Sequence, residues 1–209
     1  MLHSLITTWF SLVHDWGYFG VFFLMALEST VVPIPSELIL PPAAYWAAQG
    51  KMNFWGVWAA GTLGSYIGSI TSYAICYWLG DKWLIRYGKY FLIKENKIKV
   101  AEIIVQKHGA MGVFIARLLP VVRHLISMPA GIFRMKFSIF SIVTLTGAGF
   151  WCYILSVWGE KVIGKHPELL NSPKEMMHAV RSEMIWFILA VGGLAALYLV
   201  VIWFKRRFS

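Results

Sequence analysis

Three long stretches of the chain are apolar and contain no charged residue. They cover residues 54–79, 137–158 and 184–204. Each reaches the ~20 residues that a helix needs to cross the hydrocarbon core of a bilayer. The pattern therefore predicts three transmembrane helices in an all-α membrane protein.

Two other hydrophobic stretches, residues 16–50 and 109–133, are interrupted by charges and prolines. The charges are Glu28 and Glu37 in the first stretch and Arg117 and Arg123 in the second. A charge at the bilayer centre costs at least about 2.5 kcal/mol, and a proline inside a helix removes a backbone hydrogen bond. Broken, re-entrant helical hairpins that are buried among the spanning helices accommodate both features. We expect the breaks at Pro33, Pro35, Pro42, Pro120 and Pro129.

The two interrupted stretches resemble each other when Pro33 is aligned with Pro120. Five of the eleven positions in 33–43 then match 120–130, and after a small gap KMNF at 51–54 aligns with RMKF at 134–137. Chance similarity between two oily segments is the alternative interpretation. The repeat predicts two units, each a broken hairpin followed by a spanning helix.

Lysine and arginine are unevenly distributed among the connections. Residues 81–108 hold seven Lys and Arg against three acids, whereas residues 160–183 hold four residues of each sign. The positive-inside rule predicts that 81–108, 134–136 and the basic tail 205–209 are cytoplasmic and that 160–183 lies outside. The hairpins then enter from opposite faces, which is the inverted repeat of many secondary transporters.

Composition agrees with a membrane location. Hydrophobic residues make up 58% of the 209 residues, charged residues 14%, and the mean hydropathy is +0.64. These values are too apolar for a soluble domain. The net charge of +9 lies beside apolar segments, so we attribute it to anionic lipid headgroups and topology and not to nucleic acid.

The N-terminal segment and the cysteines add two smaller expectations. Residues 1–15 place apolar residues at helical spacing without the basic start or cleavage site of a signal peptide, which predicts an amphipathic helix in the membrane interface. Cys76 and Cys152 lie inside apolar stretches and offer neither a disulfide framework nor a metal set.

The charges inside the membrane are the candidate functional residues. If the hairpins meet near the midplane, Glu28 and Glu37 face Arg117 and Arg123. Structural ion pairs, or side chains that snorkel to the interface, are the simpler alternatives. Arginine matches a phosphate bidentately and stays charged, whereas a partly buried carboxylate can load and release a proton. The pattern therefore favours a transport site, with arginines for an anionic headgroup and glutamates for proton coupling or gating.

Several other residues have either a functional or a packing interpretation. His124 is a candidate proton relay, although a lone histidine is more often a packing residue, and Tyr66 and Tyr73 either donate hydrogen bonds into a cavity or pack. Small residues at helical spacing favour close helix contact. We expect such packing at Gly61, Gly64, Gly68, Gly131 and Gly147.

Three segments resemble one known family: ESTVVPIPSELILPPAAYWAAQG, GTLGSYIGSITSY and ARLLPVVRHLISMPAG with the GAGFW that follows it. They are similar to the DedA family of the SNARE-associated Golgi protein (VTT-domain) superfamily over roughly residues 15–160. The resemblance implies opposed re-entrant hairpins, residence in the bacterial inner membrane, and transport of undecaprenyl phosphate that depends on the proton-motive force.

The family's paired acids fall on Glu28 and Glu37, and its paired arginines on Arg117 and Arg123. One departure concerns Glu37, which stands in a Pro-Ser-Glu context where some members place an aspartate after a longer Pro-Gly stretch. This leaves the position of the second carboxylate open.

We therefore expect a flippase for undecaprenyl phosphate or a related anionic polyprenyl lipid, working with protons in the bilayer; a homo-oligomer is compatible with the sequence. A general phospholipid scramblase and a proton-coupled antiporter for small cations or drugs are the alternatives. A lipid phosphatase is the enzymatic rival, but the chain has no histidine in a Pro-Ser-Gly-His context, no paired-aspartate metal motif and no serine–histidine arrangement. We expect no enzyme activity, cofactor or metal.

Overall fold

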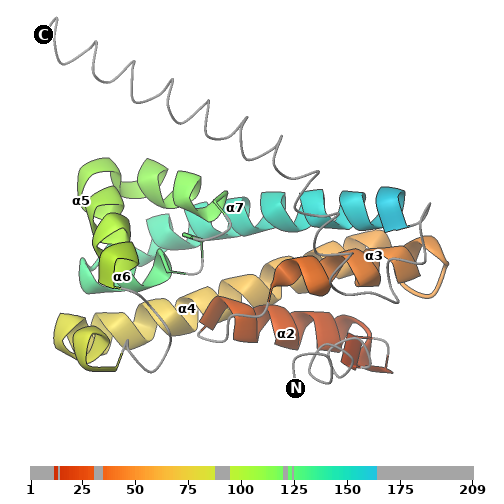
Figure 1. The fold of residues 1–209 in the computed structure, drawn as a ribbon, viewed down its shortest axis with the longest axis horizontal. Coiled ribbons are helices and arrows are strands. Elements are labelled where there is room, and N and C mark those ends of the chain that lie inside the picture. Colours follow the sequence, from red (N-terminus) through yellow and green to blue (C-terminus); the bar gives the residue numbers. More distant parts are fainter. Residues whose placement is uncertain are drawn as a thin grey trace, which may run out of the picture.

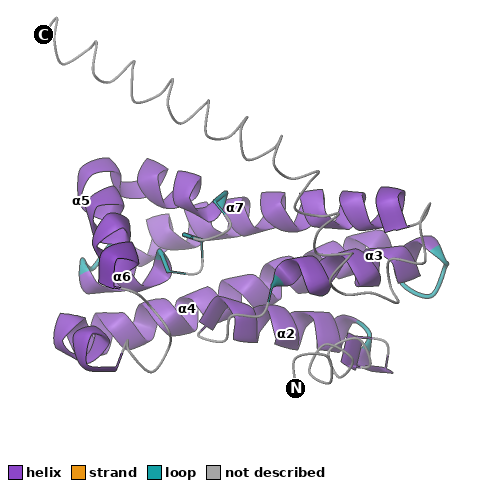
Figure 2. Ribbon diagram, viewed as in Figure 1, coloured by secondary structure: helices purple, strands orange, loops and turns teal. Residues whose placement is uncertain are grey.

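A computed structural model describes residues 12–13, 15–30, 35–87, 95–119, 122–123 and 125–163, and every regular element in these ranges is helical. Figures 1 and 2 show the arrangement. The all-α expectation is thus confirmed for the described residues. The elements are α2 (Tyr18–Thr30), the 3-10 turn η1 (Ser36–Leu38), α3 (Leu40–Ala48), α4 (Phe54–Tyr87), α5 (Glu95–Arg117), α6 (Ser127–Ile132), α7 (Phe137–Trp158) and the π-helical turn η3 (Gly159–Ile163).

The two halves of the described chain contain the same order of elements. In the first half α2 is followed by a break, the short α3 and the long α4. In the second half α5 is followed by a break, the short α6 and the long α7. A kink at Gly109 (φ 51°, ψ −128°) separates the last part of α5 from its beginning. The inverted repeat and the re-entrant hairpins stay predictions.

The short helix of each half packs on the long helix of the other half. α2 packs on α4 and α5 packs on α7, whereas α6 contacts α4, and α3 contacts α7 as well as α4. α4 and α7 lie side by side and run in opposite directions, so the α3–α4 turn and the α6–α7 turn lie at opposite ends of the fold (Figure 1). Each half therefore completes the packing of the other.

The described prolines lie at or just after the breaks. Pro35 immediately precedes η1, but Pro42 lies in the first turn of α3 and Pro129 in the first turn of α6. Proline is tolerated there because the first N–H groups of a helix have no intrahelical partner. Pro42 and Pro129 thus begin the helix that follows each break and do not form the break itself. Pro33 and Pro120 lie outside the described residues.

Several predicted segments lie mostly or wholly outside the described residues. These are the helix at 1–15 except for residues 12, 13 and 15, the connection 160–183 beyond residue 163, the span 184–204 and the tail 205–209. The predicted connection 81–108 is described at 81–87, where α4 ends, and at 95–108, where α5 begins. The cytoplasmic location of the C-terminus stays a prediction.

Large apolar side chains cover the outside of the described helices. Phe19, Trp78 and Ile142 are 78%, 83% and 63% exposed, as expected where lipid surrounds a protein. By length and composition, Phe137–Lys161, with a mean hydropathy of 1.6, is the one helix in the described ranges that could cross a membrane. α4 is longer at 34 residues but does not meet that criterion, so the spanning role of 54–79 stays a prediction.

Helices α2 and α4 approach each other backbone to backbone at two glycines. A Cβ atom on Gly64 would overlap the carbonyl group of Phe22, and a Cβ atom on Gly68 would overlap that of Ala26. Small residues at such spacing allow close van der Waals contact, which is a main source of helix association in a membrane. The glycines therefore set the distance between α2 and α4.

Gly64→Val is expected to lower the stability of the protein, because the overlapping atom belongs to the backbone and the helices must separate. Overpacking of this kind costs roughly 1–3 kcal/mol. Thermal unfolding of the purified protein in detergent measures the effect. Leu63→Val, at the neighbouring position where the side chain is 51% exposed, is the control and should unfold like the parent. Equal unfolding of the Gly64 variant would contradict the close approach.

Candidate functional site

Three of the four predicted charges are buried where the helices break. Glu28 lies in the last turn of α2, Arg117 is the last residue of α5, and Arg123 lies in the turn between α5 and α6. They are 2%, 4% and 6% exposed. A helix C-terminus carries a partial negative charge, which favours Arg117 and disfavours Glu28. Glu28 therefore needs partners of its own.

Glu28 and Arg123 form a buried ion pair between the two halves. Arg123 Nη2 donates to Glu28 Oε1, and the same nitrogen donates to Ser36 Oγ over 2.8 Å. The backbone N–H of Ser36 donates to Glu28 Oε1 over 3.0 Å. A backbone N–H and a guanidinium group thus stabilise one carboxylate oxygen. These contacts connect the break that follows α2 with the break between α5 and α6.

A tryptophan from α7 completes this cluster. The Arg123 guanidinium lies 5.0 Å from the centre of the Trp151 ring, and Trp151 Nε1 donates to Ser36 Oγ over 3.3 Å. Cation–π contact of this kind is strongest where water is excluded. Trp151 is fully buried, so its ring packs on the face of the Arg123 guanidinium and restricts the position of that side chain.

Arg117 has a different environment, made of hydroxyl groups and an aromatic ring. Nη1 donates to Ser69 Oγ over 2.8 Å and Nη2 to Ser127 Oγ over 2.7 Å. The guanidinium lies 5.7 Å from the centre of the Phe140 ring. No carboxylate in the described part of the chain pairs with Arg117, and its Nε donor is buried without a hydrogen-bond partner there. Arg117 is therefore a buried cation with spare capacity for an anion.

Hydroxyl groups connect the two arginine environments. Ser69 Oγ, which accepts from Arg117, donates to the carbonyl of Ser65, and Ser65 Oγ shares a 2.8 Å hydrogen bond with Ser29 Oγ. Ser29 directly follows Glu28 in the sequence. Ser72 adds a hydrogen bond to the carbonyl of Ser29. A polar path therefore runs along α2 and α4 between the ion pair and Arg117.

The other predicted residues lie outside the two arginine environments or contribute to helix packing. Glu37 is half-buried in η1, beside Ser36, and forms no salt bridge with a described residue. Tyr66 is half-buried on α4, whereas Tyr73 is buried and donates to the carbonyl of Met135. His124 lies outside the described residues.

Three of the predicted packing glycines face close neighbours. Gly61 faces the Leu40 side chain, Gly131 the Tyr73 backbone and Gly147 the Arg117 side chain.

Sequence reasoning missed the partners of the charged residues. Ser36, Ser69 and Ser127 hold the arginines, and Trp151 lies against Arg123. Ser36 and Trp151 stand in the quoted PSE and GAGFW segments, and Ser69 follows Gly61 and Ser65 at small-residue spacing. These residues could be seen in the sequence, but small-residue spacing alone indicates helix packing and does not identify a serine as the hydrogen-bond partner of an arginine.

The described side chains suit the binding of an anion better than that of a metal. No group of three His, Cys, Asp or Glu within the described ranges could hold a metal ion. Two buried guanidinium groups offer several N–H donors, and one of them is already balanced by Glu28. An anion with several acceptor oxygens, such as a phosphate, complements the other.

Comparison with known proteins places the chain among membrane proteins. A family model described as the VTT domain matches residues 34–161. The uncharacterized membrane protein YkoX of Bacillus subtilis is 32% identical over 207 residues, which cover 99% of this chain and 87% of that protein. Undecaprenyl phosphate transporter A of Bacillus subtilis is 39% identical over 158 residues, 76% of each chain. An alkaline phosphatase-like protein of Lactococcus lactis is 30% identical over 201 residues, 94% of this chain and 90% of that one.

No solved structure matches the chain. The matched domain covers more than half of the 209 residues and contains Ser36, Ser69, Arg117, Arg123 and Trp151. The resemblance seen in the sequence is thereby confirmed, and the protein belongs to the VTT-domain family of membrane proteins, which includes the DedA proteins.

Proposed function

We propose that the protein is a lipid transporter that moves undecaprenyl phosphate, or a related anionic polyprenyl phosphate, from the outer to the inner leaflet of the bacterial inner membrane. The observation that carries the proposal is Arg117, a buried cation held by hydroxyl groups, with a buried Nε donor that has no partner among the described residues. The relative named undecaprenyl phosphate transporter A supports the choice of lipid.

Arg117 is the proposed contact for the phosphate. Moving a bare phosphate through hydrocarbon is opposed by the large desolvation penalty of a buried ion. A buried guanidinium lowers that barrier because it offers a fixed fork of N–H donors that stays charged. Ser69 and Ser127 already hold this fork in place, so little side-chain ordering is needed when the phosphate arrives.

The ion pair between Glu28 and Arg123 is the proposed proton-dependent element. Uptake of a proton by Glu28 removes the negative charge that holds Arg123 and leaves the guanidinium available to the phosphate beside Arg117. Loss of the proton restores the pair and expels the anion. We assign to Glu37, half-buried beside Ser36, the exchange of protons with the aqueous side, and to His124 a relay role.

The interlocked halves support an inverted repeat with alternating access. α4 and α7 run in opposite directions, and each carries the short helix of the other half (Figure 1). In transporters with such repeats, substrate binds near the midplane where discontinuous helices meet. We propose that the two hairpins open in turn to opposite leaflets while the polyprenyl tail stays in lipid.

Headgroup-resolved transport in proteoliposomes tests the proposal. The purified protein should move undecaprenyl phosphate faster than phosphatidylglycerol or the uncharged alcohol undecaprenol, and an imposed pH gradient should increase the rate. Equal rates for all three lipids without a gradient would identify a scramblase. Cation efflux without lipid movement would identify an antiporter, and release of inorganic phosphate would identify a lipid phosphatase.

A further inference from the structure

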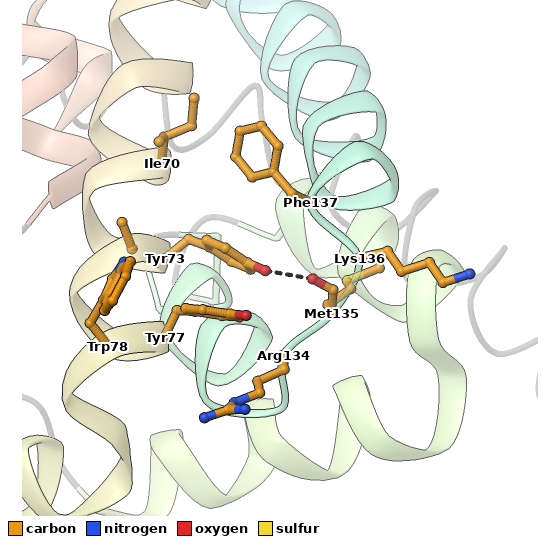
Figure 3. A pocket seen from close by; sticks show the side chains of 9 residues that line it. Ile70, Tyr73, Tyr77, Trp78, Arg134, Met135, Lys136 and Phe137 are labelled. Carbon is orange, nitrogen blue, oxygen red and sulfur yellow. Dashed lines mark hydrogen bonds between the residues drawn. The ribbon is translucent and has the colours of Figure 1, made fainter.

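A second basic site lies at the turn between α6 and α7, away from the buried ion pair. Figure 3 shows a pocket between α4 and this turn, with a volume of about 360 Å³. Four of its nine lining residues are aromatic, and its two cations, Arg134 and Lys136, come from the turn. The aromatic residues of the lining are Tyr73, Tyr77, Trp78 and Phe137.

Arg134 occupies a backbone conformation that an L-amino acid rarely adopts. Its φ is 49°, in the left-handed region where glycine is the usual residue. The turn at the other end of the fold places a glycine in that region, Gly50 with φ 76°. A strained position that keeps a long charged side chain indicates a function for that side chain.

Aromatic residues of α4 hold the turn and the arginine in place. Tyr73 donates a hydrogen bond to the carbonyl of Met135, directly after Arg134. The Arg134 guanidinium lies 5.4 Å from the centre of the Tyr77 ring, which itself stacks on Tyr73. Arg134 is nevertheless exposed, so its N–H donors are positioned by the ring and open to a ligand.

The start of α7 adds to the positive character of the pocket. In the first half, Asn53 Oδ1 accepts hydrogen bonds from the N–H groups of Trp55 and Gly56 and caps α4. The residue aligned with Asn53 is Lys136, and it gives α7 no side-chain cap. The first N–H groups of a helix carry a partial positive charge, so the uncapped end of α7, which begins at Phe137 in the pocket lining, adds to the positive charge of the turn.

The matching turn at the opposite end of the fold also has a pocket, of about 290 Å³. It has aromatic walls as well, but Asp15 lies in it together with Lys51, so its charges balance. The two pockets therefore offer an internal comparison, in which aromatic lining is shared and net positive charge is not.

We propose that the Arg134 pocket binds the phosphate headgroup of a polyprenyl phosphate at the membrane surface, as the station at which the lipid leaves or enters the transport path. The aromatic walls favour a lipid over free phosphate, because Phe137 and Trp78 are exposed apolar side chains beside the cation. Aromatic rings also favour the headgroup level of a bilayer. Only the choice of polyprenyl phosphate rests on the proposed function.

Arg134 is assigned the main contact, and Lys136 is not. Figure 3 shows the Lys136 ammonium group directed away from Tyr73 and Tyr77, whereas the Arg134 side chain runs beside Tyr77. Lys136→Gln therefore removes one positive charge from the same turn without removing the proposed contact. It is the matched control for Arg134→Gln.

Photolabelling of the full chain in nanodiscs tests the proposal. A photoreactive polyprenyl phosphate probe should label peptides that contain residues 70–78 or 133–137. Arg134→Gln should reduce this labelling about tenfold, the effect of losing one charge-assisted contact. Lys136→Gln and Lys51→Gln should reduce it far less. Excess unlabelled polyprenyl phosphate should compete, whereas the uncharged alcohol and inorganic phosphate should not.

A glycine variant separates binding from folding. Arg134→Gly relieves the backbone strain, so its thermal stability should equal or exceed that of the parent while the labelling is lost. Undiminished labelling of either Arg134 variant, or full competition by inorganic phosphate, would overturn the proposal. Arg117→Gln should lower transport about 100-fold or more and leave this labelling intact. Labelling that depends on Arg134 in a protein that moves no lipid would refute the proposed function and leave the pocket standing.

Discussion

Arg123→Met is expected to lower the free energy of unfolding by about 3–5 kcal/mol, the usual loss when one partner of a buried ion pair is removed. Arg123 is 6% exposed, and its loss leaves the Glu28 carboxylate buried without its cation and Ser36 Oγ without a charged donor. Chemical unfolding in mixed micelles, followed by tryptophan fluorescence, measures the change. Transport should fall with it.

The double variant Glu28→Gln, Arg123→Met isolates the charge effect. It leaves no ionised group at the pair, so most of the lost stability should return. Lys136→Met, at an exposed position, is the control for losing a positive charge elsewhere and should change stability by less than about 0.5 kcal/mol. A double variant as unstable as the sum of its two single variants would show that the pair is not coupled.

The pairing of Glu28 with Arg123 shows how far the sequence leads. Charges of both signs inside two hydrophobic stretches predict that the stretches meet, and the repeat predicts where. Which acid pairs with which arginine depends on side-chain positions 95 residues apart in the chain. Neither hydropathy nor charge pattern carries that information, so Glu37 and Arg117 appeared equivalent to the residues that form the pair.

The partners of Arg117 were harder to predict for a physical reason. A serine such as Ser69 is small enough to pack between helices and polar enough to accept a hydrogen bond. The sequence around Ser69 predicts only the packing, because a hydrogen bond depends on which side chain faces the serine from another element. Arg117 reaches Ser69 on α4 and Ser127 on α6, and no local pattern links these three positions.

Arg117→Gln is expected to show the opposite balance of effects to Arg123→Met. Transport of undecaprenyl phosphate should fall about 100-fold or more, which corresponds to the loss of roughly 3 kcal/mol of charge-assisted contacts. Stability should change little, because no carboxylate among the described residues depends on Arg117 and a glutamine amide can still donate to Ser69 or Ser127. Transport in proteoliposomes and thermal unfolding of the same preparation measure the two quantities.

Arg117→Lys refines this prediction. Lysine keeps the buried positive charge but lacks the planar fork that reaches Ser69 and Ser127 together and leaves Nε for the anion. Transport by this variant should fall between those of the parent and Arg117→Gln. Full transport by Arg117→Gln would remove Arg117 from the anion path. A stability loss as large as that of Arg123→Met would instead show that Arg117 is a structural cation. A residue that acts by binding the anion should lower transport without lowering stability.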